Sequence, residues 1–259
     1  MKFNSLSIIL PTLTETDSFV AAITMILEMN NHCDIEEFIA VVCDKTRKES
    51  LDSIKTGQKI AAAAGIPLKI LWQKQPYFGG AIRDGFMSAK GSHVCMVTPD
   101  LDTAPEKLPE MIALAKKYPG DIISGSRWLK GGGFVRYNKI KMIWNWCSQL
   151  FLKILYLAPL TDFTWGNHLA PTSLYQSINF QELKHPVNVE KVVIPLRLGI
   201  KFHEVPAICR MPENDQSVNS FWANFEYLRP AIRWRFAKKS TMIKNTHYRE
   251  KQHNKSVNQ

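Results

Sequence analysis

Cysteine is scarce in this chain, and its arrangement argues against two common uses of the residue. The five cysteines are odd in number, lie far apart and include no Cys-x-x-Cys pair: Cys33, Cys43, Cys95, Cys147 and Cys209. This pattern fits neither a disulfide framework nor a zinc site, and it suits a reducing compartment. Cys43 and Cys95 lie within apolar runs, which indicates buried and unreactive thiols.

Long apolar runs are absent as well. The nearest candidate for a membrane-spanning helix, Met142–Leu160, is interrupted by polar residues that include Gln149 and Lys153. A spanning helix needs about 18–20 uninterrupted apolar residues, so we expect none here. The first five residues lead directly into a strand pattern, without the apolar stretch and cleavage site of a signal peptide, and we expect no signal peptide.

Acidic residues are nearly missing from the C-terminal part of the chain. From Arg229 onward there are nine Lys or Arg against the single acid Glu250, so this segment carries +8 of the net charge of +10. Such a basic segment indicates an anionic partner or a solvated end. We favour lipid headgroups and do not expect nucleic acid. We predict a catalytic domain over residues 1–220 and a basic amphipathic helix with a disordered tail over residues 221–259.

The first half of the chain alternates strand and helix signals, as βαβ units do. Short apolar runs ended by turn residues predict five strands: Leu6–Leu10, Phe38–Cys43, Leu68–Trp72, Val94–Val97 and Asp121–Ser124. Segments with helical apolar spacing predict four helices: one that begins at Thr16 or Asp17, Lys48–Ala64, Gly80–Ala89 and Pro105–Lys117. Strands separated by helices of this length predict an α/β fold with a mainly parallel sheet.

The second half of the chain is less regular. We expect loops at residues 131–133 and 161–171. The remaining elements that we expect are a helix at Lys139–Tyr156, a helix at Val189–Leu198, a strand at Lys201–Val205 and a basic helix from Phe221 onward. The helix at Lys139–Tyr156 is amphipathic, and its aromatic stripe is either core packing or a membrane-contacting face.

Charged residues follow three of the expected strands. Asp44 follows the second, Asp100 and Asp102 follow the fourth, and Arg127 follows the fifth. In parallel sheets, ligands bind beyond the carboxyl ends of the strands. Two carboxylates in one turn can reach a single divalent cation, and Mg²⁺ or Mn²⁺ accepts such oxygen ligands together with nucleotide phosphates. An isolated Asp-x-Asp is also an ordinary turn sequence, so this motif alone does not establish a metal site.

Seven short segments follow one another in a specific order. They are residues 8–15 (IILPTLTE), 41–44 (VVCD), 78–91 (FGGAIRDGFMSAKG), 98–102 (TPDLD), 124–127 (SGSR), 162–166 (DFTWG) and 204–206 (EVP). Together they resemble the family 2 glycosyltransferases of the GT-A fold, most closely their dolichol- or polyprenyl-phosphate sugar synthase branch. The resemblance covers about residues 5–215, and the order of the segments makes it specific although each one is modest.

The resemblance implies roles for the matching residues. Asp100 would hold Mg²⁺ or Mn²⁺, and Asp102 would lie beside it as a second metal ligand. Arg127 would act in catalysis by facing phosphate, for which its planar guanidinium is suited. The residues that the nucleoside-diphosphate sugar would contact are Pro11, Glu15, Asp44, Gly80 and Arg83.

The chain also departs from the family pattern. Thr98 stands where the family has its first metal-site aspartate, and Leu13 replaces the usual aromatic residue. Residues 166–168 (GNH) and 216–218 (QSV) replace two motifs that supply cationic contacts to the acceptor. The candidates for acceptor binding are therefore Arg127, His168 and Arg210. Three residues also have a purely structural explanation, as a solvated helix face, a helix cap and a loop histidine: Arg83, Asp44 and His168.

These features predict an inverting transfer of a sugar from a nucleoside-diphosphate sugar to a polyprenyl phosphate, by a peripheral enzyme on the cytoplasmic face of an anionic membrane. A phosphate acceptor is already ionised near neutral pH and needs no general base. A sugar hydroxyl would need one, and Asp162 and Glu190 are then the candidates by position. Two alternatives stay open: a transferase that extends a polysaccharide or lipid-linked glycan, and a degenerate module in which Thr98 has removed turnover.

Overall fold

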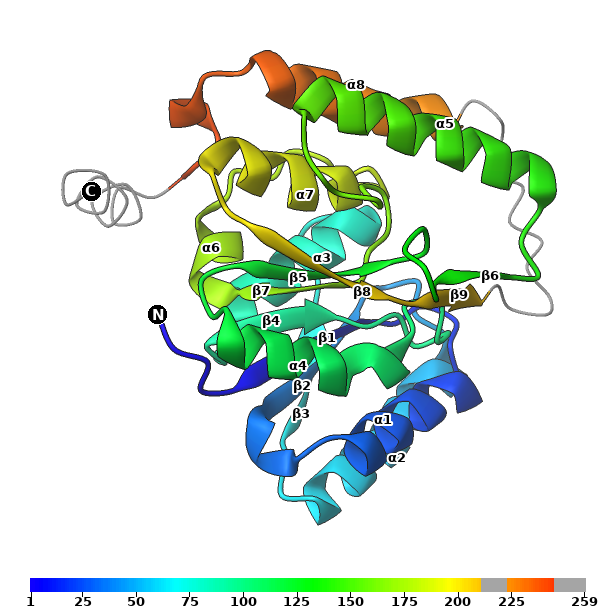
Figure 1. The fold of residues 1–259 in the computed structure, drawn as a ribbon. Coiled ribbons are helices and arrows are strands. Elements are labelled where there is room, and N and C mark those ends of the chain that lie inside the picture. Colours follow the sequence, from blue (N-terminus) through cyan, green and yellow to red (C-terminus); the bar gives the residue numbers. More distant parts are fainter. Residues whose placement is uncertain (211–222, 245–259) are drawn as a thin grey trace.

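The computed structural model describes residues 1–210 and 223–244, in which helices surround a seven-stranded sheet (Figure 1). The strands are β1 (Leu6–Pro11), β2 (Ile35–Val42), β3 (Leu68–Trp72), β4 (His93–Met96), β5 (Ile122–Ser126), β6 (Gly133–Val135), β7 (His168–Pro171), β8 (Phe202–Pro206) and β9 (Ile208–Arg210). The helices are α1 (Asp17–Met29), α2 (Lys48–Ala63), α3 (Tyr77–Ser88), α4 (Leu108–Lys117), α5 (Lys139–Tyr156), α6 (Thr172–Ser177), α7 (Val187–Leu198) and α8 (Ala223–Phe236). The 3₁₀ helices are η1 (His32–Asp34), η2 (Pro105–Lys107) and η3 (Lys239–Thr241).

The large sheet is mainly parallel, as predicted. Its strand order is β3-β2-β1-β4-β7-β5-β8. Strands β1 to β4 pair in parallel with one another, and β5 pairs in parallel with β8. β7 lies between β4 and β5 and is antiparallel to both. A separate pair, β6 and β9, lies at one end of the large sheet (Figure 1). The carboxyl ends of the parallel strands therefore share one edge, where the polar loops gather.

Alternate side chains of the central strands point to opposite faces of the sheet and fill two cores. On β1, Leu6, Ile8 and Leu10 pack with residues of α1, α2 and α4, whereas Ile9 packs with residues of α3, α6 and α7. All four side chains are fully buried. Burying one such side chain contributes roughly 1.5–3 kcal/mol, so the sheet is a firm support for the loops at its edge.

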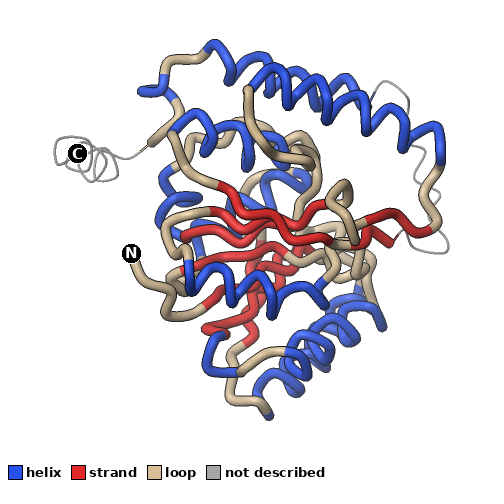
Figure 2. The backbone as a smooth tube through the Cα atoms, in the orientation of Figure 1, coloured by secondary structure: helices blue, strands red, loops and turns tan. Residues whose placement is uncertain are grey.

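Helices α5 and α8 lie side by side in an outer layer over α7 (Figures 1 and 2). The Tyr156 hydroxyl of α5 donates to the carbonyl oxygen of Ala231 of α8 at 2.7 Å. Trp234 of α8 is 1% exposed and belongs to the same core as α7. The predicted boundary at residue 220 therefore does not separate an appendage from the body, because Ala231, Trp234 and Met242 belong to the main core. The predicted helix start at Phe221 and the predicted disordered tail lie outside the described residues.

The strands and helices predicted for the first half are all present, with ends shifted by up to three residues. α3 begins at Tyr77 instead of Gly80, and β2 begins at Ile35 instead of Phe38. The loop predicted at residues 161–171 was wrong at its end, because residues 168–171 form β7. This strand has no strong strand signal of its own, and its backbone pairing with β4 and β5 exists only in the assembled sheet. Within residues 1–210 and 223–244, none of the helices is long and apolar enough to cross a membrane.

Candidate functional site

Three loops that carry residues predicted to bind the nucleoside-diphosphate sugar meet at the carboxyl edge of the sheet. The strand order places β1 between β2 and β4, so the loops that follow these strands are neighbours. The hydroxyl of Thr46, after β2, donates to the carbonyl oxygen of Thr12, after β1, at 3.0 Å. The backbone N–H of Arg47 donates to the carbonyl oxygen of Leu13 at 3.0 Å. These bonds hold the loop of Asp44, which is exposed, against the β1 loop.

Glu15 helps to shape the loop that follows β1. Its Oε2 atom accepts hydrogen bonds from the backbone N–H groups of Leu13, at 2.6 Å, and Thr14, at 2.9 Å. Pro11 ends β1 directly before this loop. The carboxylate of Glu15 therefore closes its own turn. A direct contact of Glu15 with a nucleotide stays a prediction.

The loop after β4 carries Asp100 and Asp102 and has an unusual backbone. Asp100 is exposed, and its Oδ1 atom accepts a hydrogen bond from the backbone N–H of Asp102 at 3.1 Å. Leu101 and Ala104 adopt positive φ angles of 66° and 48°. For residues other than glycine, such conformations cost roughly 1–3 kcal/mol each and cluster at functional sites. The strained turn presents the two carboxylates at the edge of the sheet, as the sequence predicted.

Two polar side chains of strand β9 lie against this turn or the 3₁₀ helix that follows it. The Cys209 thiol donates to Oδ1 of Asp102 at 2.7 Å. Arg210 forms an ion pair with Glu106, in the 3₁₀ helix that follows the turn. Arg210 is therefore close to the predicted metal turn, although its guanidinium already has a protein partner. The residues that follow it, including 216–218, lie outside the described residues.

The carboxylates after β4 fit a metal that is shared with a nucleotide, and they do not fit a closed protein site. In residues 1–210 and 223–244, no group of three His, Cys, Asp or Glu side chains lies together in an arrangement that could hold a metal. Mg²⁺ commonly uses one or two carboxylates and completes its shell with phosphate and water oxygens. Asp100 and Asp102 supply that number of hard oxygen donors. The donor set is thus compatible with the predicted Mg²⁺ or Mn²⁺.

Arg127, after β5, is buried and paired. Its Nε donates to Asp162 Oδ2 at 2.7 Å, and its Nη2 donates to Asp162 Oδ1 at 2.9 Å. The guanidinium also lies over the rings of Phe134 and Trp165, 5.2 and 5.5 Å from their centroids. Burial acts to lower the pKa of Arg127, but the attraction and hydrogen bonds of Asp162 outweigh it and raise this pKa above its usual value. The N–H groups at the edge of the guanidinium, which were expected to meet phosphate, are engaged by Asp162 in this structure.

A hydrogen-bond network connects Arg127 to helix α5. Nη2 of Arg127 donates to the Thr164 hydroxyl at 3.0 Å, and Nε2 of Gln149, on α5, donates to the same oxygen at 2.8 Å. The Trp128 indole donates to Oδ1 of Asn145, also on α5, at 3.1 Å. The inner face of α5 is therefore held by the loop that carries Arg127.

Two candidate bases are closed off from solvent. Asp162 is 1% exposed and is occupied by Arg127. Glu190 is fully buried, and it accepts from Arg233 at 2.8 Å and from the Trp234 indole at 2.6 Å. Burial raises the pKa of Glu190, and its hydrogen-bond donors act in the opposite direction. Both carboxylates are therefore engaged by buried partners within the fold, and neither is accessible from solvent.

His168 lies in the interior of the sheet and not in a loop. It begins β7, is 1% exposed, and its Nδ1 atom has no hydrogen-bond partner among the described residues. Burial lowers its pKa well below the usual value, so the ring is neutral. The acceptor-binding role expected of His168 does not fit this structure, because the side chain is buried, with the Phe202 ring edge-on to it at 6.5 Å between centroids.

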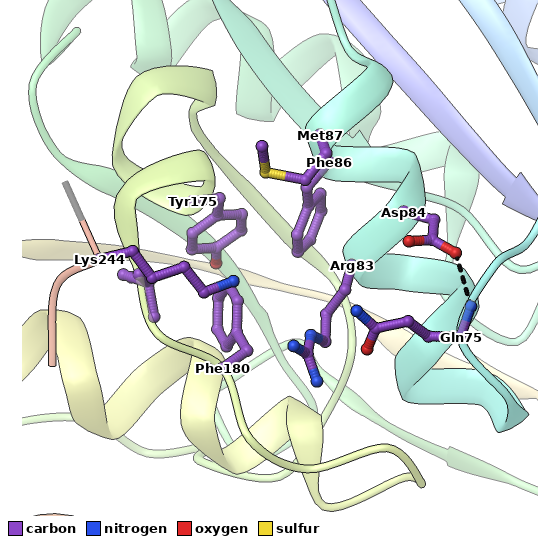
Figure 3. Close-up of a pocket in the computed structure, with 9 residues that line it drawn as sticks. Gln75, Arg83, Asp84, Phe86, Met87, Tyr175, Phe180 and Lys244 are labelled. Carbon is purple, nitrogen blue, oxygen red and sulfur yellow. Dashed lines mark hydrogen bonds between the residues drawn. The ribbon is translucent and has the colours of Figure 1, made fainter.

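Arg83 lines a pocket that shares no residue with the turn of Asp100 and Asp102. This pocket lies between α3, α6 and Lys244, and Figure 3 shows Arg83 and Lys244 approaching it from two sides. Nε of Arg83 is buried without a partner among the described residues. Gly80, one turn earlier on α3, packs so closely that a Cβ atom there would overlap the carbonyl of Gln75. Nucleotide contacts by Gly80 and Arg83 stay predictions.

The sequence assigned no role to Glu204, although this residue belongs to the segment 204–206 that contributed to the resemblance. Glu204 accepts from the backbone N–H of Thr161 at 3.0 Å and from that of Asp162 at 3.1 Å, so it orders the loop that holds Arg127. The signal for Asp162 was available in part. An arginine that directly follows the buried segment 124–126 needs a buried acid, but only the fold identifies which acid lies beside it.

Comparison with known proteins agrees with this geometry. The family model described as glycosyl transferase family 2 matches residues 7–178. A curated relative, undecaprenyl-phosphate mannosyltransferase from Micrococcus luteus, is 26% identical over 134 residues, which cover 49% of this chain and 54% of that protein. The matched segment thus spans about half the length of this relative.

Solved structures show the same fold at low sequence identity. Glucosyl-3-phosphoglycerate synthase from Mycobacterium tuberculosis, in complex with Mn²⁺, uridine diphosphate and phosphoglyceric acid, aligns with a TM-score of 0.68 and 14% identity, over 91% of this chain and 80% of that chain. The same enzyme with Mg²⁺ and uridine diphosphate aligns with a TM-score of 0.66 and 15% identity, over 90% and 79% of the two chains. The expected GT-A type α/β fold is confirmed.

Proposed function

The chain belongs to glycosyl transferase family 2, and we propose that it transfers a sugar from a nucleoside-diphosphate sugar to a polyprenyl phosphate at a membrane surface. The observation that carries the proposal is the placement of Asp44 and of the Asp100–Asp102 turn after β2 and β4, on the two sides of β1. Such an edge suits a nucleotide whose base and diphosphate lie across neighbouring loops.

Different residues of this edge contact different parts of the nucleoside-diphosphate sugar. Asp44 accepts a hydrogen bond from the base, and the turn of Glu15 holds the nucleotide against β1. Asp100 and Asp102 would hold Mg²⁺ or Mn²⁺ at the diphosphate, and the ion would supply positive charge to stabilise the leaving group. The structural relatives that contain Mn²⁺ or Mg²⁺ with uridine diphosphate support this assignment.

The acceptor is proposed to be a phosphate because its attack needs no proton removal. Asp162 and Glu190, the candidate bases, are 1% and 0% exposed, and both are engaged in buried ion pairs. A dianionic or monoanionic phosphate oxygen attacks the anomeric carbon with inversion and displaces the nucleoside diphosphate, so a base is dispensable. The named activity of the Micrococcus luteus relative supports a polyprenyl-phosphate acceptor.

Arg127 and Arg210 are proposed to serve the acceptor side. Arg210 lies on β9 beside the metal turn, and exchange of its partner Glu106 for a phosphate would keep its charge compensated. Arg127 acts in this structure through Asp162, and it can contact phosphate only if that pair opens. The cytoplasmic face of an anionic membrane is the proposed location, since a lipid acceptor and the basic segment after Arg229 both favour it.

The test is transfer of labelled sugar from a panel of nucleoside-diphosphate sugars to three acceptors: a long-chain polyprenyl phosphate in vesicles, a short water-soluble prenyl phosphate, and an oligosaccharide. We expect label in both prenyl products, dependence on Mn²⁺ or Mg²⁺, and an inverted anomeric configuration in the product. Label only in the oligosaccharide would replace the acceptor by a glycan. No label in any product, together with nucleotide binding, would identify a degenerate module.

A further inference from the structure

The outer face of α5 is apolar and exposed. Its residues Ile140, Ile143, Cys147, Leu150 and Ile154 follow one another at spacings of three and four residues, which places them along one side of the helix, and Leu157 directly follows the helix. Ile140, Ile154 and Leu157 are 68%, 64% and 82% exposed. Isolated exposed apolar residues are common in folded proteins, but a continuous stripe of this length marks an interaction surface.

The exposure of this stripe is not caused by loose packing of the helix. The opposite side of α5 contains Gln149 and Leu152, which are 5% and 0% exposed. Gln149 accepts from the backbone N–H of Phe163 at 2.7 Å and donates to the Thr164 hydroxyl at 2.8 Å. α5 is therefore held in one orientation, with its polar inner side on the Arg127 loop and its apolar side outward.

The layer that carries the stripe is basic. α5 contains Lys139, Lys141 and Lys153 and no acidic residue. The neighbouring helix α8 exposes Phe236 to 78% and is followed by Lys238 and Lys239. An apolar stripe bordered by cations is the pattern of a helix that lies in the interface of an anionic bilayer.

A basic pocket lies at the C-terminal end of the stripe. It has a volume of about 370 Å³ and is bordered by Leu157, Arg197, Arg235 and Lys239. No acidic side chain is among the described residues that line it. Nε of Arg197 is buried and has no hydrogen-bond partner among the described residues. Three cations beside an apolar rim suit a phosphate that is attached to a lipid.

We propose that the outer face of α5 and the end of α8 lie in the interfacial layer of an anionic bilayer, and that the pocket of Arg197, Arg235 and Lys239 receives the phosphate of a lipid headgroup. This inference rests on the proposed function, and it adds the surface through which the protein would reach a lipid acceptor. A second copy of the chain fits this face less well, because it would bring one basic layer against another.

The first test compares variants in vesicle co-sedimentation. Ile154→Glu places a charge on the stripe, and Met87→Glu places the same charge on α3 at a side chain of similar exposure, 59%. We expect Ile154→Glu to lower partitioning into vesicles with anionic lipid by at least about tenfold, and Met87→Glu to bind as the wild type does. Equal binding of the two variants would overturn the proposal.

The pocket has its own pair of variants. Lys239→Ala is compared with Lys59→Ala, an exposed lysine on α2. Removal of one cation near an anionic surface should weaken binding roughly fivefold. We expect this loss for Lys239→Ala and not for Lys59→Ala, and only with vesicles that contain anionic lipid. Inorganic phosphate can be added as a competitor of vesicle binding. If it displaces the protein from labelled anionic vesicles as effectively as unlabelled anionic vesicles do, the pocket binds a free anion and the headgroup assignment is overturned.

Two further readouts separate this inference from the proposed function. Quenching of tryptophan fluorescence by brominated lipid should be reduced in Trp146→Phe, because Trp146 is 52% exposed on α5. Ile154→Glu should transfer sugar to a short water-soluble prenyl phosphate at the wild-type rate and lose transfer to vesicle-bound acceptor. If the wild type labels neither acceptor, the proposed function fails while vesicle binding still tests the docking face. A wild-type dimer that Ile154→Glu dissociates, without any effect on vesicle binding, would assign the face to a second copy.

Discussion

Two groups of charged residues lie at the same edge of the sheet and differ in how far their charges are already compensated. In the first, which we call the acidic edge, Asp44 and Asp100 are exposed. In the second, the Arg127 cluster, Arg127 and Asp162 are 7% and 1% exposed and are joined by two side-chain hydrogen bonds. The acidic edge keeps charge available for a ligand, whereas the Arg127 cluster uses its charge to hold loops together.

The difference predicts opposite effects of mutation. A buried pair that loses one partner leaves an uncompensated charge in the interior, which costs stability. An exposed carboxylate that is removed changes stability little, and its loss appears in ligand binding and turnover. The following variants test this division, from the largest expected effect to the smallest.

Removal of the guanidinium should have the largest effect. Arg127→Ala should lower the free energy of unfolding by about 3–5 kcal/mol, because Asp162 stays buried without its partner. Arg127→Lys should be nearly as damaging, since one ammonium cannot reproduce both bonds. Urea unfolding measures both, with Arg210→Ala, at an exposed arginine, as the control. A loss below about 1 kcal/mol in both Arg127 variants would mean that the pair does not stabilise the fold.

Asp100→Ala should act on ligand binding and turnover and leave the stability of the fold almost unchanged. We expect the rate to fall by more than about a hundredfold, near 2.7 kcal/mol in the barrier, with the metal-dependent part of nucleotide binding lost. The free energy of unfolding should stay within about 0.5 kcal/mol of the wild type, because the side chain is exposed. Steady-state kinetics and isothermal titration with Mn²⁺ measure these effects. A variant that keeps more than about a tenth of the rate contradicts the metal assignment.

Lys191 should give the stability of the protein a dependence on pH. Its ammonium is buried, donates to the carbonyl oxygen of Gly166 at 2.8 Å, and has a pKa that burial lowers to about 7. The unfolded chain keeps this lysine charged up to about pH 10.5, so it binds more protons than the folded chain between pH 7 and 10.5. This group therefore makes stability rise with pH across that window, by up to about 1.4 kcal/mol per pH unit.

Lys191→Met should remove that slope. Urea unfolding of both proteins between pH 7.5 and 9.5 is the measurement, and the difference between the two slopes isolates the lysine from other titrating groups. The absolute stability of the variant is not the readout, because the bond to Gly166 is lost as well. Parallel slopes in the two proteins would show that Lys191 stays charged in the fold.

Thr98→Asp should have the smallest effect. The Thr98 hydroxyl donates to Thr103 at 3.2 Å, at the start of the turn that carries Asp100. An aspartate here adds a carboxylate to the acidic edge, and we expect Mn²⁺ affinity in the presence of nucleotide to rise by about two- to fivefold. Turnover of the wild type should stay within about threefold of the variant. A wild type that is inactive until this change is made would instead be a degenerate module.

Local signals in the sequence were sufficient for one half of the molecule. The alternation of short apolar runs and helical spacings predicted β1 to β5 and α1 to α4, because each of these elements buries its own face against the next one in the chain. The Asp-x-Asp turn was found for the same reason, since it directly follows a strand. The antiparallel position of β7 and the pair β6–β9 could not be found in this way, because their partners are distant in the chain.

The sequence by itself determined the fold class, the carboxyl-edge position of Asp44, Asp100 and Asp102, and the amphipathic helix at Lys139–Tyr156, all of which depend on neighbours along the chain. Only the tertiary structure decided that Arg127 is neutralised by Asp162, that His168 is buried, and which side of α5 stays exposed. Those outcomes depend on which distant groups lie within a few ångströms. Burial and charge compensation are properties of that packing, and the same residue type is a ligand in one setting and a structural ion in another.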